Sequence, residues 1–305
     1  MDWREKKILV TGAAGFLGNH IVAYLKKRGI DESNILTPRS AEYDLRKRAD
    51  CERAVAGRDL VIHAAGITGN AEFHKAHPAD IFYENLTMGV ELMEAARKAG
   101  VKKFVTIGSA TEYPNNAPLP FKEENLWIGP VESMHAPYTV AKKMLLAQGQ
   151  AYRAQYQWNA IHLLLTNMYG PGEKKDGGPI PSLIVRTAQA KVSNEATITV
   201  WGTGRATRDF LYVEDAAEAI VLAAEKYDGG EPVNIGSGYE ISIREVAESI
   251  ASEMQFKGRL EFDATKPEGL PRRMLDVSRA EREFGFRAAT SFKEGLRKTI
   301  AAHGY

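Results

Sequence analysis

Two residues of the types that transfer protons stand four positions apart in "APYTVAKKMLLA" (136–147). Pro137 suits the first turn of a helix, so we expect the side chains of Tyr138 and Lys142 on one helical face. A nearby ammonium favours the phenolate form, so we predict that the pKa of Tyr138 is lowered. Tyr138 could then exchange a proton with a substrate oxygen near neutral pH.

A serine at a strand end is the third candidate. Ser109 follows the apolar run "KFVTI" (103–107), and residues at the carboxyl ends of parallel strands face the ligand crevice of an α/β sheet. There its hydroxyl could hydrogen-bond the same oxygen as Tyr138. The alternative is structural: a serine that closes the strand, an interfacial tyrosine and a solvated lysine. Tyr-x-x-x-Lys is a weak pattern, because Tyr43 and Lys47 repeat it.

Glycines lie between the first predicted strand and the first predicted helix, in "TGAAGFLG" (11–18). Gly12, Gly15 and Gly18 would let the backbone turn tightly and approach a pyrophosphate at the helix N-terminus. The strand, turn and helix context favours dinucleotide binding over a turn needed only for packing. A cationic nicotinamide would also favour the phenolate of Tyr138.

The end of the second predicted strand indicates which dinucleotide is bound. NAD sites usually place an acid there for the ribose 2′-hydroxyl, but "LTPRS" (36–40) has Arg39 instead. Arginine suits a 2′-phosphate, so we favour NADP(H). The alternative is NAD, with Arg39 on the solvated surface.

The elements that would position these residues alternate between strand and helix. Strands are predicted at 7–11, 34–38, 59–65, 103–109 and 159–165, and helices that end at glycine at 16–28 and 81–99. Uniformly apolar strands indicate a parallel sheet covered on both faces, so we predict an α/β, Rossmann-type doubly wound fold over 1–168.

The second half has a different pattern. Residues 169–181 are rich in Gly, Pro and charge and predict a long loop. We expect 169–305 to form mainly a smaller α/β substrate-binding lobe, with segments near 207–237 returning to the first domain. Capping boxes predict helix starts at Ser242, Ser278 and Ser291.

The glycine motif, "VIHAAG" (61–66), Ser109 and the Tyr138/Lys142 pair resemble the extended short-chain dehydrogenase/reductases, in their nucleotide-sugar epimerase/dehydratase branch. The second half is similar to the GDP-L-fucose synthase group of that branch. The motifs that carry this similarity are "LTNMYGPG" (165–172), "VWGTGRATRDFLYVEDAA" (200–217), "VNIGSG" (233–238) and "KPEGLPRRMLDVSRA" (266–280).

The resemblance implies roles for individual positions. Ser109, Tyr138 and Lys142 match the catalytic triad. The positions that match the cofactor site are Gly12, Gly15, Phe16, Leu17, Gly18, Arg39, Asp44, Leu45, Ala64, Ala65, Asn85, Tyr138 and Lys142. Those that match the substrate site are Thr111, Asn167, Arg186, Trp201, Arg208 and Arg273. Arginines suit a sugar nucleotide, because its diphosphate needs fixed positive partners.

Two departures from the fucose synthases bear on the reaction. Those enzymes place an acid/base cysteine two residues after the catalytic serine, where this chain has Thr111, and a histidine where it has Gly178. Epimerisation at C3 and C5 needs groups that titrate near pH 7, and a threonine or a glycine supplies none. Dehydratases of the branch place a glutamate at the position of Thr111. Glu112 comes one residue later and points to the opposite face if the chain is still extended there.

These observations favour an NADPH-dependent reductase of a 4-keto-(6-deoxy) nucleotide-diphosphate sugar, with hydride transfer at C4 and Tyr138 as proton donor. The main alternative is a UDP-glucose/galactose type C4-epimerase with tightly bound NAD. A fucose-synthase-type epimerase/reductase is a weaker alternative, and a non-catalytic nucleotide-binding protein belongs to a different class.

Composition limits the remaining possibilities. A formal charge of +1 gives no reason to expect a nucleic-acid or membrane partner, and the single Cys51 excludes an intramolecular disulfide. We therefore expect a cytoplasmic protein, with no metal site, and by family analogy a homodimer through helices near 81–99 and 138–156. His74 and His77 are expected in a loop, and His135 as a solvated loop residue.

Overall fold

The computed structural model describes residues 3–266 and 269–305. Pro267 and Glu268 of the predicted 266–280 motif therefore lie outside the described residues. Six parallel strands form the main sheet, in the spatial order β10-β5-β4-β3-β1-β2. They are β1 (Ile8–Thr11), β2 (Ile35–Leu36), β3 (Leu60–His63), β4 (Lys103–Ser109), β5 (Asn159–Leu165) and β10 (Val233–Ile235). All five predicted strands are present, although β2 is shorter than predicted.

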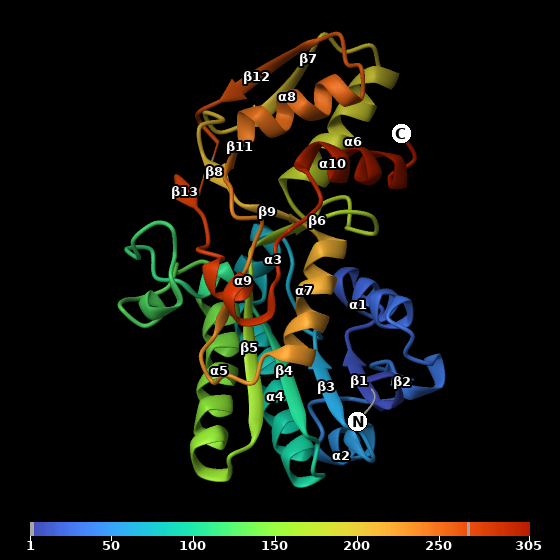
Figure 1. Cartoon of the computed structure of the whole chain (residues 1–305). Coiled ribbons are helices and arrows are strands. Elements are labelled where there is room, and N and C mark those ends of the chain that lie inside the picture. Colours follow the sequence, from blue (N-terminus) through green and yellow to red (C-terminus); the bar gives the residue numbers. More distant parts are fainter. Residues whose placement is uncertain (1–2, 267–268) are drawn as a thin grey trace.

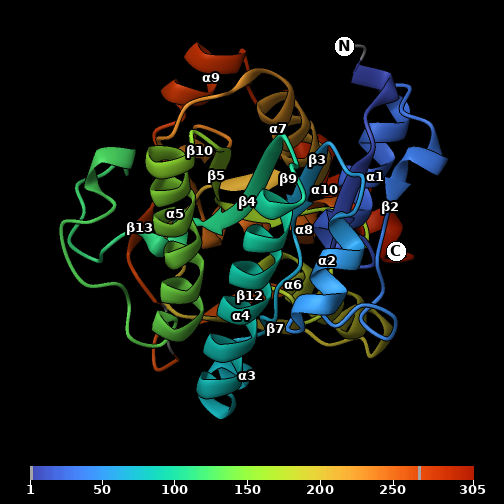
Figure 2. The same cartoon turned by 90° about the horizontal axis from the view of Figure 1, so that it is seen from below.

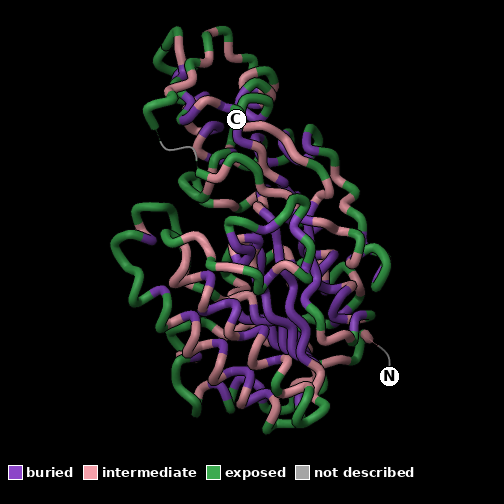
Figure 3. The backbone as a smooth tube through the Cα atoms, turned by 90° about the vertical axis from the view of Figure 1, so that its left-hand side faces the viewer, coloured by how far each residue is buried: buried purple, intermediate pink, exposed green. Residues whose placement is uncertain are grey.

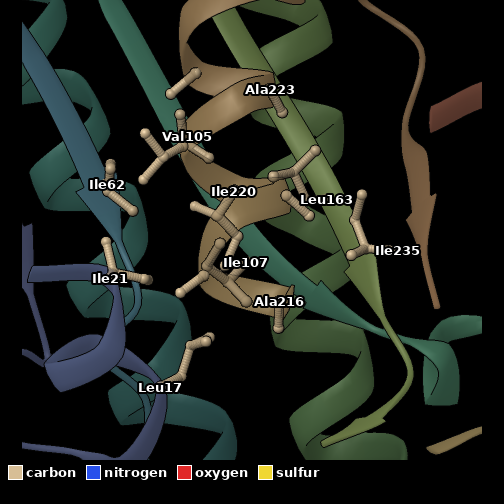
Figure 4. Close-up of a cluster of buried hydrophobic side chains, with 14 of the residues drawn as sticks. Leu17, Ile21, Ile62, Val105, Ile107, Leu163, Ala216, Ile220, Ala223 and Ile235 are labelled. Carbon is tan, nitrogen blue, oxygen red and sulfur yellow. The ribbon is translucent and has the colours of Figure 1, made fainter. Parts of the chain in front are cut away.

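Helices cover both faces of this sheet, as expected for strands that are buried throughout (Figures 1 and 2). On one face, α1 (Phe16–Lys27) packs beside α7 (Val213–Lys226), and Figure 4 shows side chains of α7 directed at β4 and β5. On the other face lie α2 (Arg48–Val55), α4 (Pro78–Lys98) and α5 (Ala136–Tyr156). The predicted doubly wound α/β fold is confirmed.

A second lobe lies beyond the carboxyl ends of the strands and has its own hydrophobic core. Its helices are α6 (Pro179–Val192), α8 (Ile243–Glu253) and α10 (Phe292–Ala302). Its strands are β7 (Thr197–Trp201), β8 (Thr207–Arg208), β11 (Ile241–Ser242), β12 (Arg259–Asp263) and β13 (Arg272–Arg273). The short pair β6 (Asn167–Tyr169) and β9 (Phe210–Tyr212) connects the two lobes (Figure 1).

Three segments of the second half pack with the first lobe. The expected return near 207–237 corresponds to α7 and β10, and β10 extends the sheet beside β5. The third segment is α9 (Ser278–Phe284), whose Ala280 and Phe284 join the core of the first lobe although the sequence pattern placed them in the second. A helix of seven residues carries too little periodicity to show which core it faces.

Helices start at all three predicted positions, but their caps differ. Ser242 and Glu245 form both bonds of the box, and Ser291 accepts the N–H of Glu294. At Ser278 the helix begins as predicted but no capping box forms, because the Ser278 hydroxyl donates to Asp276 and Val277 is the N-cap residue. An acidic side chain two residues upstream competes for the serine.

The loop predicted over 169–181 is shorter than expected, since Tyr169 ends β6 and Pro179 begins α6.

The main sheet is the most continuously buried part of the chain (Figure 3). Within 3–266 and 269–305, no helix combines the length and the apolar character needed to cross a membrane.

Candidate active site

Tyr138 and Lys142 lie in the first two turns of α5, on the same face as predicted. The Lys142 ammonium is 5.8 Å from the centre of the Tyr138 ring and donates to the carbonyl of Ala65, 3.3 Å away. Pro137 occupies the first turn, where its missing N–H costs no hydrogen bond. The pair therefore lies beside the loop that follows β3.

The prediction of a lowered pKa for Tyr138 is wrong for the protein alone. Burial raises this pKa, and the nearby charge of Glu112 raises it further. Burial also lowers the pKa of Lys142 to about 8, although Glu112 acts in the opposite direction. The spacing of Tyr138 and Lys142 predicts where the ammonium lies but not how deeply both side chains are buried. Burial has the larger effect on both pKa values. Tyr138 is thus held as a phenol, the form that donates a proton.

Ser109 ends β4 and begins a tight turn, Ala110–Glu112. Its Oγ accepts the backbone N–H of Thr111 (3.2 Å), while Glu112 accepts the backbone N–H of Ser109 (2.9 Å). The chain is therefore no longer extended at Glu112. The prediction that Glu112 points to the opposite face required an extended chain, so it does not apply. Its carboxylate folds back beneath Ser109 and is fully buried.

Glu112 continues into a buried polar network that joins β4 to β5. Its second oxygen lies 3.1 Å from Nε2 of His162, whose Nδ1 lies 2.7 Å from the hydroxyl of Thr106. All three side chains are at most 2% exposed. The turn that presents Ser109 is therefore anchored from below by paired polar groups, as buried polar groups require.

The glycine loop fits a dinucleotide. Gly12 has φ of +72°, and a Cβ there would lie 2.7 Å from the backbone nitrogen of Ala65. A Cβ at Gly18 would collide with the carbonyl oxygen of Gly12. No side chain caps α1 at Gly15, so its first-turn N–H groups remain available to an anion. Phe16 and Leu17 belong to that turn.

The other predicted cofactor positions differ in what they can offer. Arg39 is exposed after β2, with no ion pair described for its guanidinium, whereas Asp44 pairs with Arg46 at 2.7 Å. Asn85 uses its amide to bond Ile67 and Ile81, which fixes the loop after β3 instead of leaving the amide free for a ligand. Leu45, the residue after Asp44, is buried. Ala64 and Ala65 lie in the loop beside Gly12.

Two predicted substrate arginines lie side by side. Arg208 on β8 and Arg273 on β13 are direct partners in the parallel ladder, so their side chains leave the same face. Glu132 of the first lobe lies 3.2 Å from the guanidinium of Arg273, and Nε of Arg273 is buried with no hydrogen-bond partner among the described residues. Paired guanidinium groups are the usual partners of a diphosphate.

The remaining substrate positions spread over the second lobe. Arg186 of α6 lies 5.5 Å from the ring centre of Trp201, whose side chain is 52% exposed at the end of β7. Asn167 on β6 donates to the carbonyl of Asp209 at 3.4 Å. Gly178 caps α6 and offers no side chain, as predicted from the sequence.

Three residues near Tyr138 were not predicted as site residues. His74 lies in α3 (Ala71–Ala76), not in a loop, and its ring meets that of Tyr138 edge-on at 6.0 Å. His135, expected as solvated, is half-buried, 4.9 Å from His74 and 3.3 Å from Glu132. Thr139 is fully buried and donates to Thr111. Their spacing carries no motif, so only the fold could reveal them.

Comparison with known proteins identifies the family to which this chain belongs. A family model described as the NAD dependent epimerase/dehydratase family matches residues 8–236. The chain belongs to this family. The family match and the relatives confirm two predictions. The chain resembles the extended short-chain dehydrogenase/reductases, and it is an NAD(P)-dependent nucleotide-sugar enzyme.

Two relatives and one solved structure show how far the similarity extends within the epimerase/dehydratase family. A probable GDP-L-fucose synthase 1 of Oryza sativa subsp. japonica is 37% identical, with 96% of this chain and 90% of that protein covered. The GDP-L-fucose synthase of Escherichia coli K12 is 32% identical, with coverage of 97% and 95%. The structure of MlghC, a GDP-mannoheptose C4 reductase from Campylobacter jejuni with NADP bound, superposes with a TM-score of 0.90 at 27% identity, and both chains are fully covered.

Proposed function

We propose that this protein is an NADPH-dependent reductase that converts the C4 ketone of a GDP-linked 4-keto-(6-deoxy) sugar into an alcohol. The observation that carries the proposal is the state of Thr111. Its hydroxyl donates to Ser109 and accepts from Thr139, so this position holds an engaged hydroxyl where the fucose synthases carry a cysteine. A hydroxyl that is a poor base and already paired does not remove carbon-bound protons.

The residues at the carboxyl edge of the sheet suit this reaction. When bound, NADPH supplies the hydride that adds to the C4 carbonyl carbon. Tyr138, held as a phenol by burial, donates its proton to the oxygen that gains charge as the C=O double bond opens. Ser109 donates a hydrogen bond to the same oxygen, and the Lys142 ammonium stabilises the phenolate that remains on Tyr138.

The cofactor and the nucleotide follow from the residues and the relatives together. Arg39 in place of an acid suits a 2′-phosphate, and a related C4 reductase structure has NADP bound. The relatives are named for GDP-sugars, and the paired Arg208 and Arg273 offer a diphosphate site. The homodimer through α4 and α5, expected by family analogy, stays a prediction.

Turnover in deuterium oxide tests the proposal. The enzyme is incubated with NADPH and a GDP-4-keto-6-deoxyhexose, and the product is analysed by NMR. We expect NADPH to be consumed and the product to carry no solvent deuterium at C3 or C5. Deuterium at either carbon would show epimerisation, for which His74 and His135 would be the first residues to examine. Purified protein that carries tightly bound NAD and causes no net oxidation would support a C4-epimerase instead.

A further inference from the structure

A chain of hydroxyl groups runs from the core of α5 to the reaction centre. Thr139 Oγ1 donates to Thr111 Oγ1 at 3.1 Å, and Thr111 Oγ1 donates to Ser109 Oγ at 3.0 Å. Thr139 is 0% exposed, whereas Ser109 and Thr111 are half-buried at the carboxyl end of β4. The chain therefore begins inside the protein and ends at the serine predicted to meet the substrate.

The direction of the chain follows from its buried end. Each hydroxyl has one hydrogen and two lone pairs. If the chain ran the other way, the hydrogen of Thr139 would be buried, and the described residues provide no acceptor for it other than Thr111. An unpaired buried donor is costly, whereas a lone pair without a donor costs less. The hydrogens therefore point from Thr139 towards Ser109.

Ser109 receives a second hydrogen bond whose direction cannot reverse. The backbone N–H of Thr111 donates to Ser109 Oγ at 3.2 Å, and an N–H is a donor only. Both lone pairs of Ser109 Oγ are thus occupied, one by a hydroxyl and one by an amide. Only its hydrogen remains, so Ser109 can act towards a ligand as a donor and not as an acceptor.

We propose that Thr111 and Thr139 are positioning residues that fix Ser109 as a hydrogen-bond donor to the C4 oxygen of the substrate. A ketone oxygen has no hydrogen and accepts from both Ser109 and the phenol of Tyr138. Without the two threonine hydroxyls, the hydrogen of Ser109 is free to turn away from this oxygen. The inference rests on the proposed reductase function and extends it to the residues that lie behind Ser109.

Isosteric variants test the role of the hydroxyls. Thr111→Val keeps the backbone N–H bond and removes the hydroxyl, and Thr139→Val removes the first donor of the chain. For each we expect kcat/KM for the 4-keto substrate to fall by about tenfold, the value of one hydrogen bond. Thr111→Ser should restore kcat/KM to within about threefold of the native value.

A control variant separates positioning from general loss of packing. Thr187 is a buried helical threonine of α6 whose hydroxyl donates to Leu183 within its own helix. Thr187→Val should leave kcat/KM unchanged. If Thr111→Val and Thr139→Val also leave kcat/KM unchanged, or if Thr111→Ser does not restore it, the proposal is wrong.

Neutron diffraction of deuterium-exchanged crystals of the NADP complex tests the direction of the chain without turnover. We expect deuterons on Thr139 towards Thr111 and on Thr111 towards Ser109, and the opposite order would overturn the inference. If the native enzyme reduces no 4-keto sugar nucleotide, the proposed function fails, and the neutron map still decides the direction of the hydroxyl chain.

Discussion

At the scale of single residues, Lys142 shows the cost of burying a charge. Its side chain is 3% exposed, and burial lowers the pKa of the ammonium from 10.5 to about 8. Below pH 8 the folded protein must hold a buried cation that water solvates in the unfolded chain, so this residue reduces stability there. The penalty disappears as the pH rises towards 10.5, where both states lose the charge.

Replacing Lys142 should therefore stabilise the protein and abolish its activity. We expect Lys142→Met to raise the melting temperature at pH 7 by a few degrees, and to raise it less at pH 10, because the buried charge is then already lost. Differential scanning calorimetry at both pH values measures the effect. The exposed Lys75→Met serves as the control and should change neither value. A melting temperature at pH 7 below that of the native protein would contradict the argument.

At the scale of elements, the loop between β6 and α6 contains an acid with a buried carboxylate oxygen. Oε2 of Glu173 is buried and has no hydrogen-bond partner among the described residues, and burial raises the pKa of this carboxyl from 4.5 to about 8. The folded state binds the proton more tightly than the unfolded chain. Stability is therefore lost as the pH rises from 4.5 to about 8, and stays low above that.

Glu173→Gln should remove this pH dependence, since a neutral amide has nearly the same shape and does not titrate. We expect the variant to be more stable than the native protein at pH 8.5 and close to it at pH 5, measured by urea unfolding. Asp176→Asn, an exposed acid in the same loop, is the matched control and should keep the native slope. If Glu173→Gln keeps the native slope as well, the loop does not bury the carboxyl in solution.

At the scale of the whole molecule, the two lobes carry two sets of residues that are predicted to have different tasks. The first lobe carries Ser109 at the end of β4 and Tyr138 in the first turn of α5, and the second lobe carries Arg208 and Arg273 on adjacent strands. The ion pair between Glu132 and Arg273 crosses from one lobe to the other. The second lobe is thus predicted to hold the nucleotide while the first carries out the reaction.

This division predicts that GDP binding depends on Arg208. We expect Arg208→Ala to weaken GDP binding by about tenfold or more, because each charge-assisted hydrogen bond contributes about 1.5–3 kcal/mol. NADP(H) binding should be unchanged, as measured by isothermal titration calorimetry with each ligand. Arg205→Ala removes an exposed arginine three residues away and is the control. Equal losses of GDP and NADP(H) affinity would indicate unfolding instead of a lost contact.

The sequence by itself was sufficient for the features that depend on local patterns. The uniformly apolar strands, the glycine turn before α1 and the i,i+4 spacing of Tyr138 and Lys142 each involve residues close in the chain, so their consequences can be derived without the fold. The predicted direction of β4 also placed Ser109 at the carboxyl end of the strand, the end at which parallel α/β sheets bind ligands. These patterns were enough to predict the parallel sheet and the position of Tyr138 and Lys142 on one face of α5.

The tertiary structure decided what depends on residues far apart in the chain. Thr139 donates to Thr111 from 28 positions away, Glu112 meets His162 from 50 positions away, and Arg208 and Arg273 become neighbours only through β8 and β13. Burial, which no spacing reveals, raises the pKa of Tyr138 where the sequence predicted the reverse. Hydrogen-bond direction and desolvation are properties of packed surroundings, and the surroundings exist only once the chain has folded.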